Sequence, residues 1–563
     1  MFYSGHPMAS SGDQWDLSVD VVAVGSGIGG LSAAIAAHDA GGQVVVLEKA
    51  EKLGGVSAYS GGEVFLPNNH LQASAGVDDS PEKGRAYFEF LAAGYADAEL
   101  QANLLAVGPV AARYFQEKAG VRWKLIADFP DYYYPTAPGT LKAGRYLEPE
   151  LFDGKLLGQW QELSYLSPHM PNGITHDEMF AWGGFTNILE WDLGLLGKRM
   201  SRDVRSFGPA MMGYFIKAAL IDRGIPAYLE TPLRALIVRD GEVIGVRAER
   251  AGKAFTIRAK KGVVLAVGGY DYRPELTKYF EQVPEWHSMC QPTLEGDALV
   301  VGGEIGAALA TVPPNNLGHF FGYNVPGETQ AGAPLWRASW EGGFPHAIWV
   351  NRAGLRFGDE SFYRDYLPKA RSWSGVTQSL PNFPPFLVFD QNFRDKYGLG
   401  AFLPSMEFPD GLVARASSLR GLAEQLGIDP DGLESTVARF NGFVEEGVDR
   451  DFGRGSYPWA VMMTGDRRMK NPNLGALVKP PFYGLRLHVT SVGVNAAGLK
   501  TNQQAQVMHV RGAPIAGLYA AGNCAAPLEI GAGYQSGLAN LRGMVAGYLA
   551  GRHASARPLG ESR

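Results

Sequence analysis

The sequence predicts an α/β protein in which a parallel-sheet domain is interrupted by a second, mixed domain. Three observations lead to this prediction. A glycine-rich turn near the N-terminus joins a short apolar strand to a helix, and an acidic residue ends the next strand. Strand-like segments of the same kind return near the C-terminus, after a long stretch rich in Pro, Trp and Phe. A first domain that both begins and ends the chain explains all three.

The first element is a strand, turn and helix unit. Residues 21–24 are apolar and lead into GSGIGG (25–30) and the helix-forming LSAAIAAHDA. A second apolar strand, 44–47, ends at Glu48, 18 positions after the last glycine. This is the right-handed βαβ unit of a Rossmann-type domain, whose glycines allow a tight turn, close approach to a pyrophosphate and close helix packing. We expect the helix N-terminus to face phosphates and Glu48 to accept hydrogen bonds from ribose hydroxyls.

The remaining chain divides by its pattern. Segments 233–250 and 253–270 alternate apolar and polar residues and predict a β-meander that feeds a strand ending at Gly268 and Gly269. We expect the nucleotide-binding domain to cover 17–301 and 485–563, and a catalytic domain to cover 302–484. An aromatic-rich insertion with few charges lies at about 154–198. It fits ordinary packing or, alternatively, an apolar platform for a lipophilic substrate or a membrane surface.

Composition excludes several functional classes. The chain has 563 residues, a net charge of -6, and 46% hydrophobic and 19% charged residues, as in a globular enzyme of at least two domains. It lacks the basic excess that binding nucleic acid needs. Its two cysteines, Cys290 and Cys524, form no CxxC motif, so we expect no disulfide framework and no metal site. With no secretory signal and no run of about 18 apolar residues, we expect a cytoplasmic protein, with peripheral membrane contact left open.

A second glycine-serine segment follows Glu48 and Lys49 and reads LGGVSAYSGG (53–62). Small residues let a chain run beside a cofactor, while hydroxyl and N–H groups supply polar partners. The segment resembles one in the fumarate reductase and 3-ketosteroid dehydrogenase flavoprotein superfamily, where it lies along the pyrophosphate, ribityl chain and ring of FAD. Further segments resemble the same superfamily: VLAVGGY (264–270), TLEGD (293–297), the capping signature at 433–455, and IAGLYAAGN (515–523).

The resemblance implies a Rossmann-type (GR2-like) FAD-binding domain with an inserted α+β catalytic, or capping, domain. It also implies non-covalent FAD, because the glycine-serine segment contains no histidine for attachment. The residues that the resemblance assigns to FAD binding are Gly25, Ser26, Gly27, Gly29, Gly30, Glu48, Lys49, Gly54, Gly55, Ser57, Ser60, Gly61, Gly62, Ala266, Gly268, Gly269, Asp297, Gly522, Asn523 and Leu538.

Two chemistries occur in this superfamily, and they need opposite pockets. A dicarboxylate requires several cations, because burying unpaired carboxylates costs many kcal/mol, whereas a steroid requires an apolar slot. The His-Pro-Thr element of the fumarate reductases is missing, and QPT (291–293) is only weakly similar to it. Arg356 lies in GLRFGDE (354–360), which the whole superfamily shares and which therefore does not discriminate.

Two tyrosine regions resemble those of the 3-ketosteroid dehydrogenases. PDYYYPTAPG (130–139) and GRYLEP (144–149) resemble the DYxPxxPG and GRxxEP run of the Δ1-dehydrogenases. Alignment on the proline assigns the active-site tyrosine to Tyr133, and alignment on the aspartate assigns it to Tyr132. Tyr363, three positions after the shared glutamate, resembles the active-site tyrosine that accepts or relays a proton, with Tyr366 as the fallback.

The third region is GAGYQSGL (531–538), which should open a helix beneath the flavin. The resemblance implies that the Tyr534 hydroxyl and a backbone N–H near Gly537 polarise a C3 ketone. A tyrosine base then takes the proton alpha to that ketone while hydride leaves to flavin N5, and a second tyrosine or Ser536 shares the proton. The expected activity is therefore trans elimination in ring A of a 3-ketosteroid, with an external electron acceptor such as a quinone.

The alternatives follow from the same residues. The first tyrosine region favours Δ1 chemistry, whereas the Tyr-x-Ser of Tyr534 and Ser536 is more like the Δ4-(5α)-dehydrogenases. We expect Δ1 because the first match is longer. A fumarate-reductase-like ene reductase is the second alternative, and a flavin-binding carrier without catalysis is the third.

Overall fold

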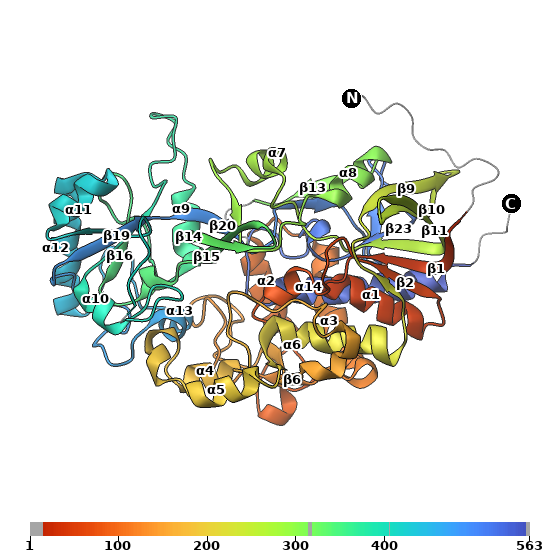
Figure 1. Cartoon of the computed structure of the whole chain (residues 1–563), viewed down its shortest axis with the longest axis horizontal. Coiled ribbons are helices and arrows are strands. Elements are labelled where there is room, and N and C mark those ends of the chain that lie inside the picture. The colour runs from red at the N-terminus through yellow and green to blue at the C-terminus, as the bar shows by residue number, and fades with distance from the viewer. Residues whose placement is uncertain (1–14, 314–317, 405, 559–563) are drawn as a thin grey trace.

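The structure is a computed structural model that describes residues 15–313, 318–404 and 406–558, and Figure 1 shows the whole chain. Residues 1–14, on which the expectation of no secretory signal mainly rests, lie outside the described residues. Within the described residues, no helix is both long and apolar enough to cross a membrane.

The largest sheet has the strand order β22-β23-β10-β11-β1-β2-β8, with β9 paired to β10. β1 (Leu17–Val24) pairs in parallel with β2 (Val44–Leu47) and with β11 (Lys253–Leu265), and α1 (Ile28–Asp39) connects β1 to β2. All of β2 is buried, as expected for a parallel strand covered on both faces. The predicted βαβ unit is therefore confirmed.

The N-terminal and C-terminal parts of the described chain meet in this sheet, at the right of Figure 1. β9 (Leu233–Arg239) and β10 (Glu242–Arg250) form the predicted antiparallel meander with β11, and β23 (Pro514–Ala520) pairs in parallel with β11. α14 (Leu538–Ala556) packs along α1, where a Cβ on Gly547 would lie 2.3 Å from the Gly29 carbonyl oxygen. The remaining strands are β8 (Ala227–Tyr228) and β22 (Gln506–Met508).

The cap contains two further sheets and lies at the left of Figure 1. One has the order β16-β17-β19-β18 and the other β12-β20-β14-β15. The predicted limits of the cap, at 302 and 484, stay a prediction. β12 and β20 lie outside these limits, although both belong to the same sheet as β14. The bounds are β12 (His287–Ser288), β14 (His319–Gln330), β15 (Ala333–Ala338), β16 (Ala347–Val350), β17 (Phe386–Phe389), β18 (Ala414–Ala416), β19 (Phe482–Arg486) and β20 (His488–Ser491).

Helices cover both domains and carry the cap's own small core. α11 (Leu419–Leu426) packs on α12 (Pro430–Glu446) and on β18 and β19. The predicted capping signature at 433–455 covers most of α12, and its residues Leu433, Val437 and Phe440 share a core with residues of β16 and β17. The other helices are α2 (Pro81–Ala92), α3 (Ala98–Ala119), α6 (Phe207–Ile216), α7 (Pro274–Leu276), α8 (Asp297–Glu304), α9 (Tyr363–Ala370), α10 (Gln391–Lys396) and α13 (Pro458–Thr464).

The aromatic insertion forms the lower edge of the molecule in Figure 1, where α4 (His176–Ala181) and α5 (Leu193–Met200) are labelled. A small sheet of order β3-β5-β4 lies beside it, built from β3 (Val64–Phe65), β5 (Tyr146–Pro149) and β4 (Trp123–Leu125). β6 (Phe152–Asp153) pairs with β7 (Val204–Arg205), and β13 (Leu309–Thr311) with β21 (Ala497–Leu499).

Candidate active site

A cavity of about 850 Å³ is lined by the glycine turn after β1, by the insertion and by the cap. Part of its wall is glycine backbone, and another part is apolar side chains. Six of the apolar residues are Phe129, Met179, Trp191, Phe320, Trp340 and Trp459. The cavity therefore combines a cradle for a polar cofactor with an apolar slot.

The glycine turn fits a dinucleotide because two of its glycines, Gly25 and Gly30, leave no space for a side chain. Gly25 has φ +107°, and a Cβ there would lie 2.2 Å from the Ala266 carbonyl oxygen. A Cβ on Gly30 would lie 1.9 Å from the Gly25 carbonyl oxygen. Gly25, Gly27 and Gly29 line the cavity, whereas Gly30 lets α1 pack against the turn. This is the division of roles that the fingerprint predicts.

Glu48 lies at the cavity wall and fixes the turn. Its Oε2 accepts hydrogen bonds from the Ser26 N–H (2.9 Å) and hydroxyl (2.6 Å), and its Oε1 accepts from the Ala50 N–H (2.8 Å). The Ser26 hydroxyl in turn accepts from the Gly54 N–H at 3.0 Å. One carboxylate thus joins the two glycine segments, while its contact with ribose stays a prediction.

The second glycine segment contributes small groups to the wall. Gly55, Ser57, Ser60 and Gly61 line the cavity. Gly54 and Gly62 do not line it and instead permit close backbone packing: a Cβ on Gly62 would lie 2.3 Å from the carbonyl carbon of Phe207. Their expected role in FAD binding is therefore indirect.

The later predicted segments divide in the same way. Ala266, Gly268, Gly522 and Asn523 line the cavity, as do Lys49 and Asp297, whose side chains form an ion pair of 3.0 Å. Gly269 does not line the cavity. A Cβ on Gly269 would lie 1.8 Å from Asn495 Oδ1, so this glycine permits close packing instead. Leu538 is fully buried and its N–H donates to the Gln535 carbonyl oxygen.

Two polar atoms in this wall fit the need of a bound cofactor. Asn523 Oδ1 and Gln291 Oε1 are buried without a hydrogen-bond partner among the described residues, and both side chains line the cavity. A buried acceptor without a donor is costly, so both positions favour a ligand that donates hydrogen bonds. The glycine cradle and these acceptors together fit FAD.

Three tyrosines gather at the apolar part of the cavity. The hydroxyls of Tyr132 and Tyr363 form a hydrogen bond with each other, and both residues are buried. Tyr534, 8% exposed, lines the same cavity. The Trp459 ring packs on Tyr132 with ring centroids 4.4 Å apart, which shields the pair from water. The structure therefore brings all three predicted tyrosine regions together.

Within the first region, the cavity tyrosine is Tyr132 and not the expected Tyr133. Tyr133 packs against Phe90 and Phe362, with ring centroids 5.1 and 5.3 Å apart, and is absent from the cavity lining. The cavity lining therefore favours the alignment on Asp131. The Asp131 carboxylate next to Tyr132 is held by Arg145 at 2.8 Å.

The fallback residue Tyr366 is also excluded from the cavity. Its ring packs against Trp349 and Phe321, with centroids 4.4 and 5.9 Å apart. Tyr363 and Tyr366 are three positions apart in α9, yet only Tyr363 lines the cavity.

Sequence reasoning missed Arg364. Its guanidinium carbon lies 3.9 Å from the ring centroid of Tyr363 and 5.5 Å from that of Tyr534. Burial raises the pKa of Tyr363, while the Arg364 charge and the Tyr132 hydrogen bond act in the opposite direction. Arg364 therefore favours the phenolate form of the predicted base. The available signal was only its position next to Tyr363.

Ser536 and Gly537 line the cavity beside Tyr534. Gly537 is the N-cap of α14, with φ +84°, and a Cβ there would lie 2.5 Å from the Phe65 nitrogen. The N-terminal end of this helix carries partial positive charge, which stabilises a developing oxyanion. The position suits polarisation of a ketone, as the resemblance implies.

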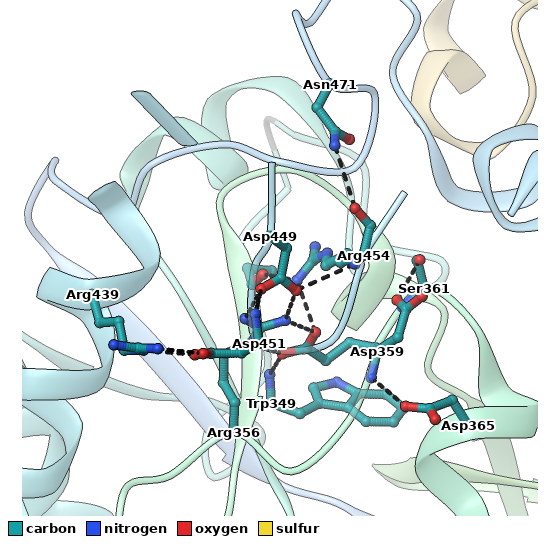
Figure 2. A network of polar contacts seen from close by, with 12 residues as sticks. Trp349, Arg356, Asp359, Ser361, Asp365, Arg439, Asp449, Asp451, Arg454 and Asn471 are labelled. Atoms are coloured by element: carbon teal, nitrogen blue, oxygen red, sulfur yellow. Dashed lines mark hydrogen bonds and ion pairs between the residues drawn. The ribbon is translucent and has the colours of Figure 1, made fainter. Parts of the chain in front are cut away.

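A buried ion network supports the turn that carries Tyr363. Arg356 binds Glu360 through two contacts of 2.6 Å and Asp449 at 2.9 Å, and Figure 2 shows Arg356 facing Asp449. Arg454 Nη1 lies 3.4 Å from Glu360 Oε2. Arg356 does not line the cavity, so its role in the structure is to support this turn.

Replacing Arg356 by methionine is expected to lower the free energy of unfolding by about 3–5 kcal/mol, because two buried carboxylates lose their nearest cation. Urea unfolding followed by circular dichroism measures the change. The matched control is Arg439→Met, since Arg439 pairs with Asp451 on the surface and its loss should leave the midpoint near the wild-type value. Equal midpoints for both variants would contradict a supporting role.

Comparison with known proteins agrees with this geometry. The family model described as "FAD binding domain" matches residues 20–540. The chain is 35% identical to 4-oxocyclohexanecarboxylate 2-dehydrogenase of Sinomonas cyclohexanicum, over 96% of this chain and 93% of that protein. It is 32% identical to 3-oxosteroid 1-dehydrogenase of Mycolicibacterium smegmatis, over 90% of this chain and 92% of that protein.

A solved structure is similar over the same length. The 3-ketosteroid Δ1-dehydrogenase of Sterolibacterium denitrificans, in complex with 1,4-androstadiene-3,17-dione, aligns with a TM-score of 0.86 at 30% identity. The alignment covers 96% of this chain and 99% of that one.

Proposed function

This chain belongs to the FAD binding domain family of flavoproteins, and from that premise we propose that it is a 3-ketosteroid Δ1-dehydrogenase. It is an FAD-dependent oxidoreductase acting on CH–CH bonds. The observation that carries the proposal is that Tyr132, Tyr363 and Tyr534 line the same cavity as the glycine cradle, together with many apolar side chains. This arrangement suits proton removal next to a ketone.

The proposed mechanism assigns one role to each group. Bound FAD supplies the hydride acceptor at its N5. Tyr363 takes the proton alpha to the ketone, and the Tyr132 hydroxyl and the Arg364 charge stabilise the phenolate that does so. The Tyr534 hydroxyl and the Gly537 N–H donate hydrogen bonds to the ketone oxygen, where enolate charge develops. Ser536, beside them in the wall, assists proton transfer.

Paired charges in the wall favour a steroid over a small keto acid as substrate. The cationic side chains lining the cavity are Lys49, Arg337 and His176, and each faces a carboxylate: Asp297, Glu328 and Glu148 respectively. The carboxylate of such a keto acid would therefore find no unpaired cation among the described residues that line the cavity. Burying a carboxylate without a partner is costly. The apolar residues of the insertion suit the rings beyond ring A.

Turnover of three ring ketones with an artificial electron acceptor tests the proposal. Androst-4-ene-3,17-dione is expected to give the 1,4-dien-3-one, detected by mass and ultraviolet absorbance. Conversion only of a 5α-saturated 3-ketosteroid to the 4-enone would indicate Δ4 chemistry. Turnover of 4-oxocyclohexanecarboxylate alone would move the substrate to the class of the first relative. Reduction of fumarate with an electron donor, and no turnover of any ring ketone, would reject every ketone dehydrogenase assignment.

We propose further that a lipophilic substrate reaches the cavity from a membrane surface and that the external electron acceptor is a quinone. Apolar side chains that are at least 38% exposed gather in the insertion and at its edge. Two of them, Leu193 and Met200, also line the cavity. The others are Leu156, Leu163, Leu166 and Leu189. Such a face suits peripheral contact with lipid.

A further inference from the structure

We propose that Glu63, His176, Glu148, Lys124 and Asp177 form a proton relay that connects the active-site cavity to solvent. The inference rests on the proposed function, because the relay removes the proton that Tyr363 takes from the ring ketone. Tyr132 and Tyr363 are 1% and 3% exposed, so a proton held by this pair needs a route out before the next turnover.

The small sheet β3-β5-β4 sets the relay residues in a row. Val64 pairs with Leu147 across β3 and β5, so Glu63 comes next to Glu148 in the antiparallel register. Glu148 also pairs with Lys124 across β5 and β4. The row therefore runs Glu63, Glu148, Lys124 from one edge of the sheet to the other.

Helix α4 places His176 between the two carboxylates. His176 is its first residue, and the adjacent Asp177 reaches Lys124. His176 Nε2 lies 3.1 Å from Glu63 Oε1, and His176 Nδ1 lies 2.6 Å from Glu148 Oε2. Lys124 Nζ lies 2.8 Å from Glu148 Oε1 and 2.9 Å from Asp177 Oδ2. The neighbouring groups from Glu63 to Asp177 thus lie close enough for a proton to pass between them.

The two ends of the row lie in different surroundings. Glu63 and His176 line the cavity, and their side chains are 11% and 4% exposed. The side chains of Lys124 and Asp177 are 28% and 36% exposed. The row therefore begins in a buried, largely apolar wall and ends in contact with solvent.

Charge balance lets the row accept one proton. Burial alone would lower the pKa of His176, but the carboxylates of Glu148 and Glu63 raise it to about 10, so both ring nitrogens carry hydrogen at neutral pH. Three carboxylates and two cations give a net formal charge of -1. One added proton brings the row to neutrality, without the cost of an uncompensated buried charge.

Glu63 is coupled to the tyrosines that handle the proton. Burial is the main cause that raises the pKa of Tyr363, and the Glu63 charge raises it further; the same holds for Tyr534. Glu63 also lies directly over Gly61 of the glycine-serine segment, because a Cβ on Gly61 would be 2.4 Å from Glu63 Oε2. The carboxylate is thus held at the part of the wall where the predicted cofactor and the tyrosines meet.

The transfer is a sequence of proton hops with no change in oxidation state. Once hydride has left the substrate, cavity water carries the proton from Tyr363 to the Glu63 carboxylate. His176 passes its Nδ1 proton to Glu148 and recovers a proton from Glu63 at Nε2. Lys124 releases a proton to Asp177 and solvent, and takes the one on Glu148. One proton enters at the cavity, one leaves at the surface, and every group returns to its first state.

Proton release during flavin reduction tests the relay. FAD-loaded protein is mixed in stopped flow with androst-4-ene-3,17-dione in weak buffer containing a pH indicator. In the wild type, proton release is expected to follow the bleaching of the flavin absorbance. In Glu63→Gln and in Asp177→Asn, proton release should lag by about 10²-fold behind the flavin bleaching of the same variant. Formate added to Glu63→Ala should restore release.

The matched control is Glu150→Gln, since Glu150 lies just past the end of β5 and pairs with Arg122 at the surface. It should release protons as the wild type does. Proton release in step with bleaching in both Glu63→Gln and Asp177→Asn overturns the relay and leaves the proposed function intact. Absence of bleaching in the wild type overturns the proposed function and the relay with it. A purely structural role for the row would give slow bleaching and no response to formate, which also overturns the proposal.

Discussion

Replacing Tyr363 by phenylalanine is expected to lower kcat for ketone dehydrogenation by about 10³-fold, while the purified protein stays yellow. The change removes only the hydroxyl that takes the proton, whereas the ring keeps its packing against Phe320, with centroids 4.8 Å apart. The predicted FAD contacts lie in the glycine segments, so FAD binding should not change. Steady-state turnover and flavin content measure the two effects separately.

Tyr366→Phe is the matched control for this variant. The two tyrosines lie in the same helix α9, and both are buried, at 3% exposure each. Tyr366 faces Trp349 instead of the cavity, so loss of its hydroxyl should leave kcat near the wild-type value. Similar activities of the two variants would defeat the assignment of Tyr363 as the base.

Replacing Gly25 by alanine is expected to give a colourless protein that binds FAD tenfold to about 10²-fold more weakly, or not at all. Gly25 has φ +107°, and the new Cβ would lie 2.2 Å from the Ala266 carbonyl oxygen, so the turn must move. Backbone strain of about 1–3 kcal/mol corresponds to this loss in affinity. Flavin absorbance of the purified protein and titration with FAD measure it.

Gly41→Ala separates this collision from the effect of backbone conformation alone. Gly41 also has positive φ, +85°, but a Cβ there would meet nothing within 4 Å. This variant should retain its flavin. Circular dichroism on both variants establishes that each is folded. Full FAD retention by Gly25→Ala would show that the turn does not cradle the cofactor.

Local patterns made much of the site predictable. The structure confirms the β1–α1–β2 unit, the meander and the return of the C-terminal strand. These elements could be predicted because neighbouring residues encode each of them, as apolar runs, turn glycines and alternation. FAD as cofactor and the steroid dehydrogenase resemblance are confirmed by the family and the relatives. The roles of Tyr363, Tyr534, Ser536 and Gly537 stay predictions, although all four line the cavity.

The tyrosine of the first region shows where local patterns stop. Three consecutive tyrosines have the same chemistry, so motif alignment leaves the choice between Tyr132 and Tyr133 open. In the structure, Tyr132 packs on Trp459 in the cavity wall, whereas Tyr133 packs on Phe90 and Phe362 outside it. These partners are distant in sequence, so tertiary packing determines which side chain faces the cavity.

By itself, the sequence determined the fold class, the cofactor and the type of chemistry, because glycine spacing, strand pattern and residue identity are local properties of the chain. The tertiary structure alone decided which charges face one another. Glu63, Lys124, Glu148 and His176 come from four separate segments, and no spacing predicts that they form one row. Ion pairs depend on distance in space, and in this protein that distance is set by the register of a three-stranded sheet and the helix packed beside it.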